Sequence, residues 1–252
     1  MGTSSIFWGN NDRNPLLPDG YEENVEQNVS TVDWKTAKAD LSKFITQSRG
    51  HSTAEHVIRQ AIRANGGAHR MIVNNSAGIR TAQAISTFFS NIEKNGLRTT
   101  LYDLGVQYTG RSIEDVFSIL INIMAPASET KEDIVARKAI QEALCDIYDY
   151  IEEAHMDLTS IDKLPRDLMD LAMKTFLKEY IWATVMKDLE SRIEIYMADV
   201  QDACEKETEL KEIIDAVVDT AYFDCESVLK DDVKDAVYKL TEQCLSILGG
   251  IV

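Results

Sequence analysis

Paired cysteines, long apolar runs and a leader-type start are all missing from this 252-residue chain. No two of its four cysteines form a CxxC pair, and no apolar run approaches the roughly 20 residues that span a bilayer. The chain does not begin with a charged region followed by an apolar one, as a secretion signal does. We therefore expect a cytoplasmic protein with no membrane anchor. Its cysteines should be structural and buried, because all of them fall in apolar helical registers: Cys145, Cys204, Cys225 and Cys244.

Catalytic and ligand-binding signatures are absent as well. The sequence contains no P-loop, no GxGxxG after a strand, no HExxH and no GxSxG. His51, His56 and His69 lie close together in the sequence, but no acidic or Cys ligands stand at a matching spacing. We therefore expect a protein that is not an enzyme and that has no cofactor and no metal site.

Glycine and proline are missing from most of the second half of the chain. No glycine occurs from Arg111 to Leu248, and no proline follows Pro165. Apolar residues recur there at a spacing of three to four, which is the period of an amphipathic helix. The sequence therefore predicts an all-α fold, a multi-helix bundle of long helices preceded by an extended N-terminal arm.

Capping and stop residues predict where the helices begin and end. The expected helices are one behind the N-cap Asp33, one from Thr53 to Ala64, one from Ala68 to Lys94, one from Arg111 to the stop at Pro126, and one behind Ser128 or Thr130 with Asp133 completing a capping box. Later breaks are expected near Glu190 to Glu194 and near Asp224 to Asp232. Residues 1–32 are then arm and linker, and residues 33–252 form a helical domain, either undivided or split into lobes at 33–125 and 126–252.

The first eighteen residues, MGTSSIFWGNNDRNPLLP, have no helical period and are rich in Gly, Asn and Pro. They predict an exposed arm, and the polar, acidic stretch from Asp19 to Thr31 predicts a linker. Met1 and Gly2 could also begin a myristoylation motif. That motif needs Ser or Thr at the sixth position, where this chain has Ile6, so we do not expect lipidation.

Charge is unevenly divided along the sequence. Residues 1–100 carry 11 Lys and Arg against 9 Asp and Glu, whereas residues 101–252 carry 15 against 33. An acidic half repels phosphate backbones, so direct binding of nucleic acid is not expected. The acidic residues either keep the surface soluble or dock on a basic partner.

Arginines gather around the double glycine at Gly66 and Gly67. Arg59 and Arg63 are one turn apart on the same predicted helix face, Arg70 follows just past the turn, and Arg80 comes later in the sequence. Guanidinium groups in this arrangement suit a phosphate or carboxylate on a ligand or partner. The alternative is that they pair with the acidic half of the same chain, and the sequence leaves both interpretations open.

Four short stretches resemble one known family. They are the opening MGTS, PLLP at Pro15 to Pro18, the double glycine followed by AHRM up to Met71, and EDIVARKA from Glu132 to Ala139. Together they resemble the QatB family, which belongs to the Qat antiphage defence operon of bacteria. The resemblance implies a bacterial protein encoded beside an ATPase, a QueC-like enzyme and a TatD-like nuclease, with the catalysis carried out by these neighbours.

The resemblance leads to two hypotheses about the arm. In the first, the QueC-like partner receives the arm and attaches a deazaguanine-type group to Gly2. The partner-binding residues are then Gly2, Thr3, Ser4, Ser5, Ile6, Phe7, Trp8, Pro15, Leu16, Leu17 and Pro18. In the second, the chain is a helical scaffold or sensor that bridges the ATPase and the nuclease, and the arm is only a docking peptide. An ordinary disordered terminus is the simplest alternative to both.

Overall fold

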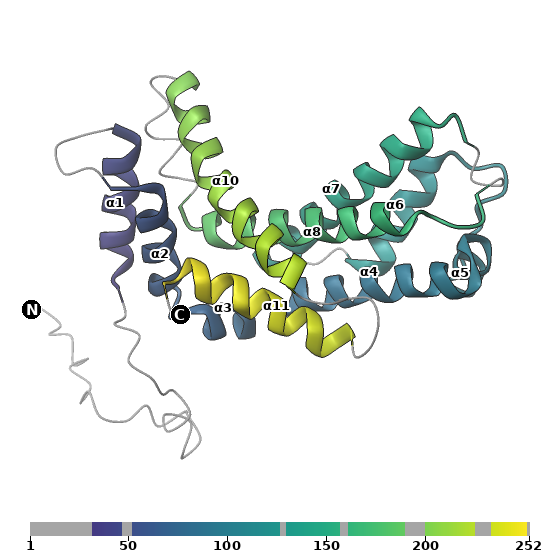
Figure 1. Ribbon diagram of the computed structural model, residues 1–252, viewed down its shortest axis with the longest axis horizontal. Coiled ribbons are helices and arrows are strands. Elements are labelled where there is room, and N and C mark those ends of the chain that lie inside the picture. Colours follow the sequence, from purple (N-terminus) through teal and green to yellow (C-terminus); the bar gives the residue numbers. More distant parts are fainter. Residues whose placement is uncertain are drawn as a thin grey trace, which may run out of the picture. The chain divides into compact units, whose positions relative to one another are not determined.

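The computed structural model describes residues 32–46, 52–126, 130–156, 161–189, 200–224 and 233–250. Within these ranges the chain forms ten helices and no strand, so the all-α prediction is confirmed (Figure 1). The helices are α1 (Trp34–Thr46), α2 (Ala54–Ala64), α3 (Ala68–Asn74), α4 (Ser76–Asn95), α5 (Leu97–Asp103), α6 (Ile113–Met124), α7 (Lys131–Glu153), α8 (Arg166–Met186), α10 (Val200–Asp224) and α11 (Val233–Leu248). Residues 1–31 and most residues of the two expected late breaks lie outside the described ranges, so the extended arm remains a prediction.

Several helices begin at the expected caps. The carboxylate of Asp33 accepts a hydrogen bond from a backbone N–H in the first turn of α1, at 3.3 Å. Thr53 accepts one from the backbone N–H of His56 in α2, at 3.2 Å. At the start of α7, Thr130 accepts from the backbone N–H of Asp133 at 3.2 Å and donates to the Asp133 carboxylate. Each cap satisfies an amide that a helix start leaves without an intrahelical partner.

The second half of helix α8 lies in the interior of the described part of the protein. Its residues from Tyr180 to Met186 are all buried, although they cover every side of the helix. A helix that is apolar all round is typical of a protein interior. The most extensive contact is with α7, and α10, α4, α2 and α11 also pack against α8. Early and late parts of the chain therefore share one hydrophobic core along α8.

The predicted helix from Ala68 to Lys94 is wrong in one respect, because the chain breaks at Asn75 into α3 and α4. The backbone at Asn75 is not helical, with φ −113° and ψ 43°. Tyr180 of α8 donates its hydroxyl hydrogen to the Asn75 carbonyl oxygen at 2.7 Å, and Lys187 donates to the Asn75 side-chain oxygen at 2.9 Å. These partners are more than 100 residues away in the sequence, so local patterns could not reveal the break.

Two further differences from the sequence predictions concern α5 and the cysteines. Helix α5 is not predicted by the sequence; it starts where the backbone N–H of Leu97 donates to the carbonyl oxygen of Asp162 at 2.7 Å. Cys244 is buried as expected, but Cys145 and Cys204 are exposed, so the burial prediction is wrong for them, and Cys225 lies outside the described residues. An apolar register within a long helix does not say which flank of the apolar face meets solvent. Partial burial raises the pKa of the Cys145 thiol, with nearby carboxylates adding to the effect, so this thiol is poorly ionised.

Candidate partner-binding surface

The arm residues named above lie outside the described ranges, from Gly2 to Trp8 and from Pro15 to Pro18. Their role therefore stays a prediction. The arginines around the double glycine, by contrast, all lie on described residues. They can be placed one by one on α2, α3 and α4.

A tight turn joins α2 to α3, with Arg63 on the last turn of α2 before it and Arg70 on α3 after it. The backbone N–H of Gly66 donates to the Arg63 carbonyl oxygen at 3.0 Å, and Gly66 and Gly67 have φ of 89° and 90°. Arg70 folds back over this turn, because a Cβ at Gly66 would lie 2.5 Å from Arg70 Cδ. The positive φ favours glycine at position 66, whereas the exposed Arg70 side chain could move to make room for a Cβ. Arg70 is exposed and Arg63 is half-buried.

Arg59 has a different environment, at the C-terminal end of α11. A Cβ at Gly250 would lie 2.7 Å from Arg59 Nε, so the guanidinium group lies directly against the backbone that follows α11. The last carbonyl groups of a helix carry partial negative charge, which favours a nearby cation. Arg59 therefore lies beside the C-terminal end of α11 while it is still exposed at the surface.

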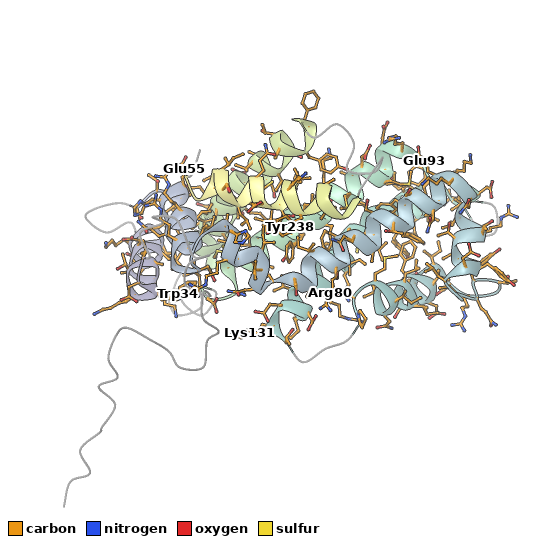
Figure 2. All side chains as sticks on the ribbon, turned by 90° about the horizontal axis from the view of Figure 1, so that it is seen from below. Trp34, Glu55, Arg80, Glu93, Lys131 and Tyr238 are labelled. Atoms are coloured by element: carbon orange, nitrogen blue, oxygen red, sulfur yellow. The ribbon has the colours of Figure 1, made fainter. Side chains whose placement is uncertain are left out.

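None of these three arginines forms an ion pair with another described residue. Other arginines in the described part do. Arg80, labelled on α4 in Figure 2, lies 3.6 Å from Asp133 at the start of α7, and Arg166 lies 3.1 Å from Glu93. Pairing with the acidic half of the chain is therefore observed for Arg80. For Arg59, Arg63 and Arg70 no such pairing is seen among the described residues.

The sequence around this turn is depleted of acid. From His56 to Ile92 the chain has no Asp or Glu, although 42 of its 252 residues are acidic. The charged residues of this stretch are all arginines apart from its histidines. Two residues of the neighbouring α11 contact His69. The Glu242 carboxylate lies 3.2 Å from His69 Nδ1, and the Tyr238 hydroxyl lies 3.3 Å from the same ring nitrogen. Burial, followed by the Glu242 charge, raises the pKa of Tyr238.

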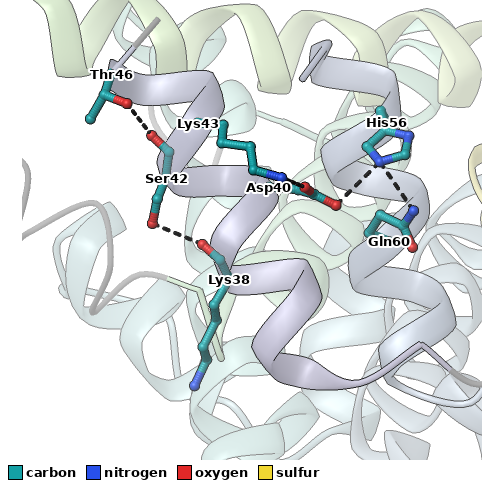
Figure 3. Close-up of polar contacts among 7 residues, drawn as sticks. All are labelled: Lys38, Asp40, Ser42, Lys43, Thr46, His56 and Gln60. Carbon is teal, nitrogen blue, oxygen red and sulfur yellow. Dashed lines mark hydrogen bonds and ion pairs between the residues drawn. The ribbon is translucent and has the colours of Figure 1, made fainter. Parts of the chain in front are cut away.

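A polar cluster fixes how α1 lies against α2 (Figure 3). Asp40 of α1 is buried, and its carboxylate lies 3.2 Å from His56 Nε2 of α2 and 2.9 Å from Lys43 Nζ. Gln60, one turn after His56, contacts the same ring nitrogen at 3.1 Å. Burial alone raises the pKa of Asp40, but hydrogen bonds from Lys43 and His56 outweigh it and bring the pKa below its ordinary value.

This cluster also places the root of the arm. The two helices run in opposite directions side by side, as Figure 1 shows. Asp40 faces the turn between His56 and Gln60, and Trp34 is six residues before Asp40, or about 9 Å at 1.5 Å per residue. Because α2 runs antiparallel to α1, the position on α2 level with Trp34 is six residues after His56, in the last turn of α2 beside Arg63. The first described residues, Val32 to Trp34, therefore lie at the same end of the α1–α2 pair as the α2–α3 turn.

Two hollows occur elsewhere on the described surface. One, of about 360 Å³, is lined by residues of α4 and α7 and by the end of α6 from Met124 to Pro126, and its lining includes the paired Arg80 and Asp133. The other, of about 300 Å³, is mainly apolar and is lined by residues of α4 and α6 together with Leu104. Among the described residues no group of His, Cys, Asp or Glu is arranged to hold a metal ion, and no described helix is long and apolar enough to cross a membrane.

Comparison with known proteins gives one family. The description of that family is "Qat anti-phage system associated protein QatB", and its sequence model matches residues 66–248. No curated protein and no solved structure matches the chain. The matched range begins at Gly66 in the α2–α3 turn and extends to the end of α11, so it includes Arg70 but not the arm, Arg59 or Arg63.

Proposed function

The chain belongs to the QatB family of the Qat anti-phage system, and from this membership we propose that it acts as the non-enzymatic substrate of a QueC-like partner in bacterial defence. In this proposal the partner receives the N-terminal arm and attaches a deazaguanine-type group to Gly2. The family match is the observation that carries the proposal, because it identifies the defence system. The sequence of the arm supports the choice of Gly2.

The chemistry required at Gly2 is the formation of an amide. A QueC-like enzyme activates a carboxylic acid with ATP and normally joins it to ammonia. When Met1 is removed, the α-amino group of Gly2 can take the place of ammonia: its nitrogen attacks the activated carboxyl carbon, the amide C–N bond forms, the activating group leaves with its electron pair and the nitrogen loses a proton. An α-amino group has a pKa of about 7.7 to 8.0, against about 10.4 for Lys, so far more of it is unprotonated at neutral pH.

The residues after Gly2 suit insertion into a narrow channel. Glycine has no Cβ to obstruct the activated group. Thr3, Ser4 and Ser5 are small and can form hydrogen bonds along a channel. The apolar Ile6, Phe7 and Trp8 are proposed to hold the arm at the channel mouth. The stretch Pro15, Leu16, Leu17 and Pro18 is proposed to stiffen the arm where it leaves the channel.

We propose a cytoplasmic location and no catalytic step on this chain itself. The ATPase and the TatD-like nuclease of the operon are further proposed partners. A second function remains in competition, in which the helical body bridges those two proteins and the arm is only a docking peptide. The long helices and their continuous core suit a rigid bridge as well as they suit a substrate carrier.

Removing residues 2–18 separates the two functions in part. The full chain and the shortened chain are each produced with the QueC-like neighbour, purified through the neighbour and used in phage-plating assays. The substrate proposal predicts that the shortened chain loses both defence and stable association with the neighbour. Full defence by the shortened chain would contradict it. If the full chain associates with the neighbour but its Gly2 is unmodified, the bridging function is favoured.

A further inference from the structure

The α2–α3 corner combines arginines that have no ion pair among the described residues with an exposed apolar side chain. We define it as Arg63 on the last turn of α2 and His69, Arg70 and Val73 on α3. Arg63 and Arg70 have no ion-pair partner among the described residues. Val73 is 58 % exposed and follows Arg70 by three residues, so the two side chains share one face of α3. Arginine is enriched at protein–protein interfaces relative to the rest of a protein surface.

The charge around the corner indicates the chemistry of what binds there. The corner lies in the stretch from His56 to Ile92, which has no acid in a chain of net charge −16. One acid of another element, Glu242 of α11, contacts His69 of the corner. Arginine presents a planar fork that binds carboxylates through two parallel hydrogen bonds. The complementary surface is therefore acidic and offers carboxylates.

The position of the corner indicates which partner is involved. The arm joins the helical body at Val32 to Trp34, level with the last turn of α2. Any protein that holds the arm is thus kept close to the corner by the chain itself. A second contact made at such high effective concentration can strengthen binding by a factor of about 10² to 10⁴.

We propose that the α2–α3 corner docks an acidic patch on the partner that receives the arm, next to the entrance through which the arm passes. This inference rests on the proposed function for the existence of that partner. Arg63 and Arg70 supply the charge contact and Val73 supplies the apolar contact. Arg59 is not included, because its guanidinium group lies against Gly250 after the end of α11.

The test compares two double charge reversals in the full-length chain. Arg63→Glu with Arg70→Glu changes the corner, and Arg98→Glu with Arg111→Glu makes the same change of charge at two exposed arginines that have no ion pair in the described part. Binding to the purified QueC-like partner is measured by biolayer interferometry at about 50 and 200 mM salt. The corner variant should bind at least tenfold more weakly and show a smaller salt dependence than wild type, while the control should match wild type.

Further measurements keep the outcomes distinct. Circular dichroism and the melting temperature check that each variant is folded, and Arg63→Gln with Arg70→Gln replaces the reversal if it is not. Equal affinity of the corner variant and the control for the partner would overturn this inference alone. The same holds if the corner substitutions abolish binding to a DNA oligonucleotide and leave binding to the partner unchanged. Strong partner binding through the corner with an unmodified Gly2 would overturn only the proposed modification. No binding by the wild-type chain would overturn both.

Discussion

Two aspartates of the helical body have pKa values that are shifted in opposite directions, and their surroundings explain the difference. Asp40 receives hydrogen bonds from Lys43 and His56, which stabilise its charged form. For Asp215 on α10, burial is the dominant effect and raises the pKa, because the nearby Lys178 and Lys211 pair with other carboxylates. One oxygen of Asp215 is buried and has no hydrogen-bond partner in the described part of the chain. The first aspartate therefore supports the fold when it is charged, and the second opposes it.

Asp40→Asn should lower stability at neutral pH by about 1 to 2 kcal/mol, because it removes charge-assisted hydrogen bonds between α1 and α2. The pKa of Asp40 is depressed in the folded state, so its contribution is present above the unfolded value of 3.8 and is lost as the pH falls through the folded value. Urea unfolding at a series of pH values measures this. The difference from wild type should shrink in acid, and Asp103→Asn, at an exposed position, should change little.

Asp215→Asn should have the opposite effect and raise the melting temperature at pH 7 by about 1 to 3 °C. The folded pKa of Asp215 lies above the unfolded value of 3.8, so ionisation costs stability at neutral pH and costs nothing once both states are protonated. The gain should therefore disappear toward about pH 3. Glu212→Gln, on the exposed side of the same helix, is the control. A fall in melting temperature at pH 7 would show that Lys178 and Lys211 stabilise Asp215 more than burial destabilises it.

Among the structural elements, the junction of α3 and α4 depends most on distant parts of the chain. Tyr180 packs so closely on α4 that a Cβ at Gly78 would lie 1.9 Å from its ring, and its hydroxyl reaches the Asn75 carbonyl. Lys187 joins Asn75 to Glu132 of α7, at 2.9 and 3.0 Å. The hydrogen bond from Lys187 lowers the pKa of Glu132. The α3–α4 junction, the start of α7 and the C-terminal end of α8 thus meet in one polar network that is only partly buried.

Tyr180→Phe tests this network while preserving the ring that packs on Gly78. Loss of the hydroxyl leaves the buried Asn75 carbonyl without that hydrogen bond, so the free energy of unfolding should fall by about 1 to 3 kcal/mol. Hydrogen exchange should accelerate first at the α3–α4 junction. Tyr102→Phe, at a position that is 80 % exposed, should leave both measurements unchanged. An unchanged stability of the Tyr180 variant would show that the break does not depend on this hydroxyl.

The elements also show what the sequence can and cannot predict. Helix starts at Asp33, Thr53 and Thr130 were predictable, because an N-cap acts within one turn. The grouping of Arg63 and Arg70 around the double glycine was also predictable, because these residues are close together in the sequence. The break at Asn75 and the place of Arg59 against Gly250 were not, since their partners are far away in the sequence. The arm was recognisable from its composition, but its position lies outside the described residues.

At the scale of the whole molecule, charge is separated along the chain. Residues 101–252 carry most of the acidic residues, with 33 Asp and Glu against 15 Lys and Arg. The acid-free stretch from His56 to Ile92 provides the arginines next to the root of the arm. A chain of this kind presents a cationic corner to one partner while the rest of its surface repels polyanions. This separation fits a defence component whose arm and corner act together on a single partner.

The most direct test of the central claim is the mass of the N-terminal peptide. The full chain is produced in bacteria that resist phage, with and without the QueC-like neighbour, and the peptide that begins at Gly2 is analysed by tandem mass spectrometry. We expect an added deazaguanine-type acyl group on the Gly2 nitrogen, present only when the neighbour is active and absent from every lysine. An unmodified Gly2 in cells that are fully protected against phage would contradict the proposal.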